Sequence, residues 1–171
     1  MSYGFMQKCV AGLVGALAGV LIVGCDTPGP AAVRMKQADN QVRFEHVALN
    51  VADPPATADW YCKNLGMKLI KQGQPPVNAR FISDAGGNMM LELYTNPPDA
   101  VPNYRSMNPL LLHIAFTVDD IQAVRAKLLG VGATIAEDIT TTPAGDQILI
   151  LRDPWGLAIQ FVKRTKPMLW K

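Results

Sequence analysis

Four polar residues of this 171-residue sequence have types and spacings that suit metal coordination. His46 lies 46 residues before Glu92. His113, which follows His46 by 67 residues, lies 47 residues before Gln160. Two imidazoles and a carboxylate are good ligands for a divalent metal, and an amide oxygen can complete the set. The spacings therefore predict a site for one divalent metal ion, namely zinc, nickel, manganese or iron.

An internal repeat accounts for the matching intervals. Residues 44–70 and 111–136 contain a strand, a helix and a leucine-plus-glycine ending in the same order. Gly66 stands where a helix C-terminal glycine is expected, and Asp119 and Asp120 are suitable N-caps for the second helix. Three further strand-like segments follow each helix, at 67–71, 79–83 and 88–95 in the first half and at 134–138, 147–153 and 157–163 in the second. Each half is therefore predicted to be a βαβββ module of an α+β fold.

The four polar residues fall on equivalent faces of their strands, because successive side chains of a strand point to opposite sides. His46 opposes the aliphatic face of residues 44–51, and the other three oppose the aliphatic faces of their own strands. A buried amide without a partner costs about 1 to 3 kcal/mol, so Gln160 in an apolar strand needs one. Packing of the modules about a pseudo-twofold axis would bring the four side chains to one point, with the Gln160 amide oxygen facing the metal.

Several motifs resemble those of the vicinal oxygen chelate superfamily, to which glyoxalase I belongs. The motifs are HVALNV (46–51), WYCKNLGM (60–67), LELY (91–94), HIAFTV (113–118) and DPWGLAIQF (153–161). The resemblance covers about 42–163 and is specific in combination, although each motif alone is weak. It implies two βαβββ modules that form a glyoxalase/bleomycin-resistance-type curved mixed sheet around a metal, and it implies a homodimer.

The same resemblance implies that the metal positions are His46, Glu92, His113 and Gln160. In glyoxalase I the last position is normally a glutamate that takes a proton from the substrate carbon, and an amide has no basic oxygen for that work. Glu92 is then the candidate catalytic base, or else the glyoxalase reaction is absent. With only one carboxylate ligand, a divalent ion keeps a net positive charge, which makes it a stronger Lewis acid toward an anionic oxygen.

These residues favour a metal-dependent lyase or isomerase that acts on a small oxygenated metabolite through an enolate or oxyanion bound to the metal. A ring-cleaving dioxygenase is a more distant alternative, because two histidines and one carboxylate also suit iron. The second class is a non-catalytic protein of the bleomycin-resistance type, which binds or sequesters a small molecule. Arg80 and Tyr94 are candidates for substrate contact, and structural roles suit them equally. Each polar residue taken singly also has an ordinary structural explanation, such as an ion pair between Glu92 and Arg80.

The N-terminal segment 1–24 is predicted to be a bacterial lipoprotein signal peptide. A small and apolar run follows Lys8 and is shorter than the roughly 20 residues that span a bilayer. Ile-Val-Gly-Cys (22–25) resembles a lipobox, which implies lipidation of Cys25, and Asp26 resembles a signal for retention at the inner membrane. The protein would then be anchored to a membrane and face the periplasm or exterior. An ordinary signal peptide or an uncleaved anchor is the alternative.

The rest of the chain divides into a flexible tether over 25–41, a glyoxalase-like domain over 42–164 and a C-terminal tail over 165–171. The two modules of the domain are expected at about 42–98 and 109–164. A net charge of +2 with no basic cluster argues against a nucleic-acid partner. The expected partners are a small-molecule substrate or ligand, the membrane through Cys25, and a second copy of the chain.

Overall fold

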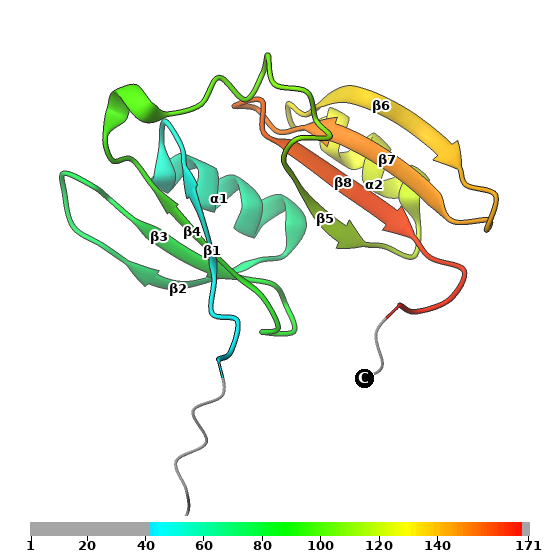
Figure 1. The fold of residues 1–171 in the computed structure, drawn as a ribbon, viewed down its shortest axis with the longest axis horizontal. Coiled ribbons are helices and arrows are strands. Elements are labelled where there is room, and N and C mark those ends of the chain that lie inside the picture. The colour runs from blue at the N-terminus through cyan, green and yellow to red at the C-terminus, as the bar shows by residue number, and fades with distance from the viewer. Residues whose placement is uncertain (1–41, 169–171) are drawn as a thin grey trace, which may run out of the picture. The chain divides into compact units, whose positions relative to one another are not determined.

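The computed structural model describes residues 42–168. The predicted signal peptide, Cys25 and the tether 25–41 lie outside the described residues, as do residues 169–171. Within 42–168, no helix is both long enough and apolar enough to cross a membrane. Two modules follow one another along the chain, each with the element order βαβββ (Figure 1).

The helices and strands agree with the predicted repeat. The first module contains β1 (Val47–Asn50), α1 (Pro54–Leu65), β2 (Lys68–Gln72), β3 (Arg80–Ser83) and β4 (Met90–Tyr94). Residues 95–112, called the connecting segment below, follow β4 and contain a short 3-10 helix (Pro98–Ala100). The second module contains β5 (His113–Thr117), α2 (Ile121–Leu129), β6 (Thr134–Thr141), β7 (Gln147–Arg152) and β8 (Ala158–Lys163). The predicted α+β fold is confirmed, and its strands form two four-stranded mixed sheets.

The two sheets have the same strand order and equivalent register. Their orders are β1-β4-β3-β2 and β5-β8-β7-β6. In each sheet the first two strands are parallel and the other neighbours are antiparallel. Ala48 lies beside Glu92 in the first sheet, and Ala115 lies beside Gln160 in the second. The repeat therefore extends to residue pairing, with Glu92 and Gln160 at equivalent positions.

Side-chain caps and a glycine define the helix ends. Asp53 accepts the N–H of Ala56 at 3.0 Å where α1 begins. Of the two aspartates predicted to cap α2, Asp120 does so by accepting the N–H of Ala123 at 2.9 Å. Each such cap contributes about 1 kcal/mol. Gly66 ends α1 at a φ of 71°, in the left-handed region that other side chains adopt only with strain.

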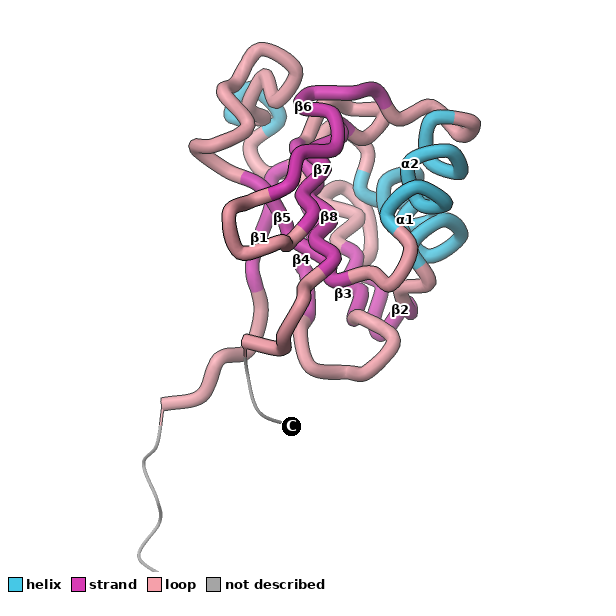
Figure 2. Tube along the Cα trace, turned by 90° about the vertical axis from the view of Figure 1, so that its right-hand side faces the viewer, coloured by secondary structure: helices cyan, strands magenta, loops and turns pink. Residues whose placement is uncertain are grey.

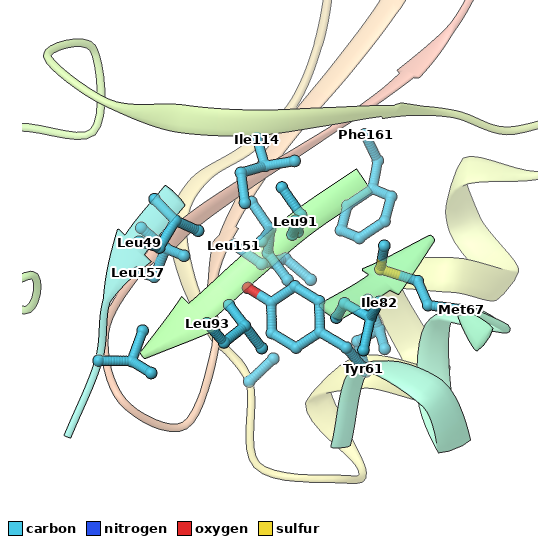
Figure 3. Close-up of a cluster of buried hydrophobic side chains, with 14 of the residues drawn as sticks. Leu49, Tyr61, Met67, Ile82, Leu91, Leu93, Ile114, Leu151, Leu157 and Phe161 are labelled. Atoms are coloured by element: carbon cyan, nitrogen blue, oxygen red, sulfur yellow. The ribbon is translucent and has the colours of Figure 1, made fainter. Parts of the chain in front are cut away.

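One hydrophobic core joins the two modules. Figure 2 shows α1 and α2 on the same side of the strands, so each sheet has one face toward the helices and one face without a helix. The buried side chains of the core are gathered in Figure 3, and they include Leu49, Tyr61, Met67, Ile82, Leu91 and Leu93 from the first module and Ile114, Leu151, Leu157 and Phe161 from the second. The strand residues that alternate with these point to the helix-free faces.

Candidate functional site

His46 and Glu92 lie together on the helix-free face of the first sheet. Nε2 of His46 is 3.2 Å from Oε2 of Glu92, and the two side chains are 32% and 25% exposed. His46 directly precedes β1, whose parallel pairing with β4 brings the two residues side by side. On the other side of the ring, Nδ1 of His46 contacts the carboxylate of Glu45. An imidazole between two carboxylates, partly open to solvent, can bind a cation or exchange a proton.

His113 and Gln160 hold the equivalent positions in the second module. His113 is the first residue of β5, and its Nδ1 lies 3.0 Å from the carbonyl oxygen of Pro109. A carbonyl only accepts, so Nδ1 carries the proton and Nε2 of the neutral ring keeps its lone pair. Gln160 is half-buried beside Ala115, on the helix-free face of the sheet. Because its amide is not sealed from water, it avoids the full cost of an unpaired buried polar group.

In the described part of the chain, His46 and Glu92 are in contact and are not grouped with His113. Among residues 42–168, no three His, Cys, Asp or Glu side chains are grouped so that they could hold one metal ion. The modules pack through their helix-bearing faces into one core, which leaves the His46–Glu92 pair on one sheet and His113 with Gln160 on the other. Their joint role as metal ligands stays a prediction.

Of the two candidates for substrate contact, only Tyr94 shares the face of Glu92. Tyr94 follows Glu92 by two residues along β4. Arg80 pairs with Leu93, whose fully buried side chain marks the opposite face. The ion pair considered between Arg80 and Glu92 does not form in the described part of the chain. The Arg80 guanidinium instead donates to three carbonyls of its own loop, those of Gly73 at 3.4 Å, Asn78 at 2.9 Å and Ala79 at 3.1 Å.

Two residues of this face are missing from the sequence-based candidates. Phe81 is the antiparallel partner of Glu92, and its ring meets that of His46 edge-to-face with centroids 5.9 Å apart. Lys71 pairs with Phe81, and its Nζ lies 5.6 Å from the centroid of that ring. Alternation along residues 79–83 could have placed Phe81 on the polar face. An irregularity in β2 between Leu69 and Lys71 shifts the pairing, and no residue type in the sequence marks it.

The turn that leads into β8 is held by a buried carboxylate. Asp153 is 1% exposed. It accepts three hydrogen bonds, from the N–H of Trp155 at 3.0 Å, the N–H of Leu157 at 2.9 Å and the hydroxyl of Tyr61 at 3.0 Å. Burial raises the pKa of the Asp153 carboxyl above its ordinary value, and these hydrogen bonds act in the opposite direction. Gly156 has a φ of 99°, and a Cβ there would lie 2.7 Å from the Arg105 backbone. The D-P-W-G segment thus fixes where the strand that carries Gln160 begins.

The architecture and its motifs match a known family. The model of the Glyoxalase/Bleomycin resistance protein/Dioxygenase superfamily matches residues 43–161. The chain belongs to this superfamily. The predicted superfamily membership is therefore confirmed, and the match extends over both modules. The uncharacterized protein YwbC of Bacillus subtilis (strain 168) is 30% identical to this chain over 127 residues. The alignment covers 71% of this chain and 98% of YwbC.

Solved structures share the superfamily fold. A glyoxalase family protein from Bacillus cereus aligns with a TM-score of 0.62 at 18% identity, covering 74% of this chain and 97% of that one. A glyoxalase family protein from Enterococcus faecalis aligns with a TM-score of 0.54 at 26% identity, covering 71% and 97%. TnmS3, an antibiotic binding protein from Streptomyces sp. CB03234, aligns with a TM-score of 0.55 at 20% identity, covering 73% and 100%. The shared fold does not select between catalysis and binding.

Proposed function

We propose that this superfamily member is a metal-dependent lyase or isomerase that acts on a small oxygenated metabolite. The observation that carries the proposal is the contact between Nε2 of His46 and Oε2 of Glu92, 3.2 Å apart on a helix-free sheet face. An imidazole and a carboxylate that are both partly open to solvent can share a cation or transfer a proton. Neither side chain belongs to the hydrophobic core, which lies on the other face.

The donor set fits a divalent metal. His46 and Glu92 supply an imidazole and a carboxylate, and Gln160 supplies an amide oxygen. His113 supplies a second imidazole, whose orientation is fixed by the contact between its Nδ1 and the Pro109 carbonyl. Such a contact on the remote nitrogen is typical of histidines that ligate metals. When bound, a zinc, nickel, manganese or iron ion would stabilise negative charge on a substrate oxygen as a Lewis acid.

A second copy of the chain would complete the ligand set, because one chain keeps its polar pairs on separate sheets. Phe44 and Leu111 stand at equivalent places, each two residues before a histidine, and are 73% and 76% exposed. These two exposed apolar side chains would be available to a second copy of the chain. A two-fold dimer would place the His46–Glu92 pair of one copy opposite the second-sheet pair of the other, and its symmetry would make two such sites.

Glu92 is the residue to which we assign proton transfer. Its carboxylate lies on the helix-free face, whereas Gln160 at the equivalent position has no basic oxygen. The contact with His46 orients one carboxylate oxygen and leaves the other available. In an isomerisation, the carboxylate would take a proton from one substrate carbon and return it to the neighbouring carbon, so the step needs neither an oxidant nor a reductant.

The second candidate function is binding without chemistry on the same faces. Gln160 favours this non-catalytic function, because it places an amide, which has no basic oxygen, at the position where the first module has the carboxylate of Glu92. TnmS3 shares the fold and is named an antibiotic binding protein, a likeness of fold alone at 20% identity. Tight binding of a small apolar ligand by metal-free protein, equal in wild type and Glu92→Gln, would select this function over the enzyme.

Metal content of the full chain tests the site. After dialysis, elemental analysis of the wild type should find one divalent ion per site, and Glu92→Ala and His113→Ala should each lose most of it. Asp99→Ala removes an exposed carboxylate on the 3-10 helix and is the matched control, so it should keep the metal. Wild-type protein that takes up no zinc, nickel, manganese or iron would refute the metal site.

Two complementary variants test the role of the second copy. One variant carries His46→Ala with Glu92→Ala, and the other carries His113→Ala with Gln160→Ala. Neither should bind metal by itself. A mixed dimer, purified through two different affinity tags, retains one intact site of two and should recover about half of the wild-type metal content. A mixed dimer without metal, or a monomeric wild type in sedimentation analysis, would contradict the shared site.

We also propose that the mature chain is a lipoprotein of the cell envelope. The support is the sequence of 22–26, in which Cys25 is the residue to be lipidated and Asp26 suits retention at the inner membrane. Mass spectrometry of the mature N-terminus should find a diacylated Cys25. An unmodified Cys25 would contradict the lipid anchor and leave the site unaffected.

A further inference from the structure

A row of side chains crosses all four strands of the first sheet on its helix-free face. Direct pairing places Ala48 beside Glu92, Glu92 beside Phe81, and Phe81 beside Lys71. Directly paired residues share a face, so the row runs from the His46–Glu92 pair to an ammonium group at the β2 edge. Neighbouring strands are about 4.8 Å apart, so the backbones of β4 and β2 are separated by roughly 10 Å.

Phe81 links the two ends of this row. Its ring lies edge-to-face with the His46 ring at a centroid distance of 5.9 Å and an interplanar angle of 89°. The Lys71 Nζ lies 5.6 Å from the centroid of the same ring. A cation held by an aromatic ring loses part of its freedom before any ligand arrives. No carboxylate among residues 42–168 forms an ion pair with Lys71, so its charge is available to a ligand.

The second sheet carries the opposite charge at the corresponding place. Its row runs from Ala115 through Gln160 and Ile150 to Glu137, again by direct pairing. Glu137 therefore takes the position that Lys71 has in the first sheet, and it is exposed. A ligand with one anionic end is attracted at the first row and repelled at the second, which favours a single orientation.

We propose that Lys71 and Phe81 form the part of the site that receives a carboxylate-bearing ligand. This inference rests on the proposed function, and it narrows the substrate class to small organic acids. Their carboxylate pairs with Lys71 while a planar or apolar segment lies beside Phe81, and their vicinal oxygens face His46 and Glu92. Lys71 is a specificity-determining residue and takes no part in proton transfer.

A pair of probes that differ only in the distal charge tests the inference. The probes are 3,4-dihydroxyphenylacetate and its methyl ester, which share a ring and vicinal oxygens. Calorimetry uses the full chain loaded with zinc, an ion that does not oxidise the catechol. At low ionic strength the wild type should bind the acid about three- to fivefold more tightly than the ester, as expected for one exposed ion pair. The preference should decline with added salt.

Variants at Lys71 decide the outcome. Lys71→Met should bring the two affinities together, and Lys71→Glu should reverse the preference. Lys68→Met is the matched control on the same strand, since the Lys68 ammonium already donates to the Ala85 carbonyl at 3.0 Å, and it should keep the wild-type preference. Circular dichroism verifies that each variant is folded.

The possible failures are distinguishable. Equal affinities for both probes in the wild type, or an unchanged preference in Lys71→Met, would overturn the inference and leave the metal site standing. Ester binding that survives in Glu92→Ala would count against the metal site itself. Zinc-loaded wild type that binds neither probe would overturn the inference alone, because its zinc content already tests the metal site.

Discussion

The two modules share a backbone and a register, but their helix-free faces differ. In the first module Met90 and Tyr94, which flank Glu92, are half-buried. The equivalent residues of the second module, Ala158 and Val162, are 3% and 4% exposed. The face around the His46–Glu92 pair is therefore more open to solvent than the face around Gln160.

Arg152 ties the second sheet to the segment that connects the two modules. It lies on the helix-free face of this sheet beside Ala158. Its guanidinium donates to three carbonyls, those of Tyr104 at 2.7 Å, Met107 at 2.7 Å and Gly156 at 3.0 Å. The connecting segment is thereby held against the second sheet. The second module is thus tied to the connecting segment through Arg152, whereas the first module presents the His46–Glu92 pair to solvent.

The largest effect is expected at the buried contact between modules. Asp153→Ala should lower the free energy of unfolding by about 3 kcal/mol, because it leaves the buried Tyr61 hydroxyl, the buried Leu157 N–H and the part-buried Trp155 N–H without an acceptor. Burial and the nearby Asp153 raise the pKa of Tyr61 well above its ordinary value, so its hydroxyl stays a donor at neutral pH. Urea denaturation measures the loss. The exposed Asp99→Ala should change stability by less than about 0.5 kcal/mol, and an equally small effect of Asp153→Ala would contradict the role of this contact.

Two arginines that bind only carbonyls provide the next comparison. Arg152→Met should cost about 2 kcal/mol, because three charge-assisted hydrogen bonds to the connecting segment and the turn are lost. Arg80→Met should cost about 1 kcal/mol, since its acceptors all belong to its own loop over 73–79. Denaturation gives both values, and hydrogen exchange of residues 104–107 should rise only in Arg152→Met. Equal hydrogen exchange in the two variants would contradict the view that Arg152 holds the connecting segment whereas Arg80 holds only its own loop.

The third test makes the two faces chemically alike. On the proposed function, Gln160→Glu adds a carboxylate to the ligand set and should tighten zinc binding about tenfold. Glu92→Gln should weaken binding by at least as much. The double variant Glu92→Gln with Gln160→Glu keeps one carboxylate and should lie near the wild type if both positions ligate the same ion. Competition with a chromophoric chelator measures the affinities, and an unchanged affinity in Gln160→Glu would exclude Gln160 from the ligand set.

Local signals made most of the fold predictable. Gly66 and Asp120 mark helix ends by conformations and hydrogen bonds that involve only neighbouring residues, and both lie where the pattern placed them. Alternation assigned the faces of the strands correctly at the core positions Leu91 and Ile159, which are 1% and 0% exposed. The strand that was expected to begin at Phe44 begins at Val47, because β1 pairs only from that residue onward.

The candidate site was predictable only in part. The alternation of side chains along a strand shows which residues share a face of the sheet, but it does not show which other part of the protein packs on that face. The pairing of His46 with Glu92 follows from the neighbouring parallel strands β1 and β4. The separation of this pair from His113 depends on which faces of the two modules pack against each other. Packing through either face would bury apolar residues, so the sequence pattern does not decide between the two arrangements. The position of Lys71 on this face could not be predicted, because the irregularity in β2 shifts the strand pairing and no residue type in the sequence indicates it.

The smallest expected effect concerns acid stability and again separates the modules. In the second module, hydrogen bonds from the Arg125 guanidinium lower the pKa of the Asp138 carboxyl from 3.8 to about 2. The unfolded chain therefore binds more protons between these values, so the contribution of Asp138 is present above pH 3.8 and is lost as the pH falls toward 2. In the first module, desolvation of Asp84 is outweighed by hydrogen bonds from the Met89 and Asn88 amides, which lower its pKa without any cation. Asp138→Asn should flatten the decline of unfolding free energy between pH 4 and 2, and added salt should mimic that change by screening Arg125. An identical pH profile in wild type and Asp138→Asn would show that the exposed pair contributes nothing to the folded state.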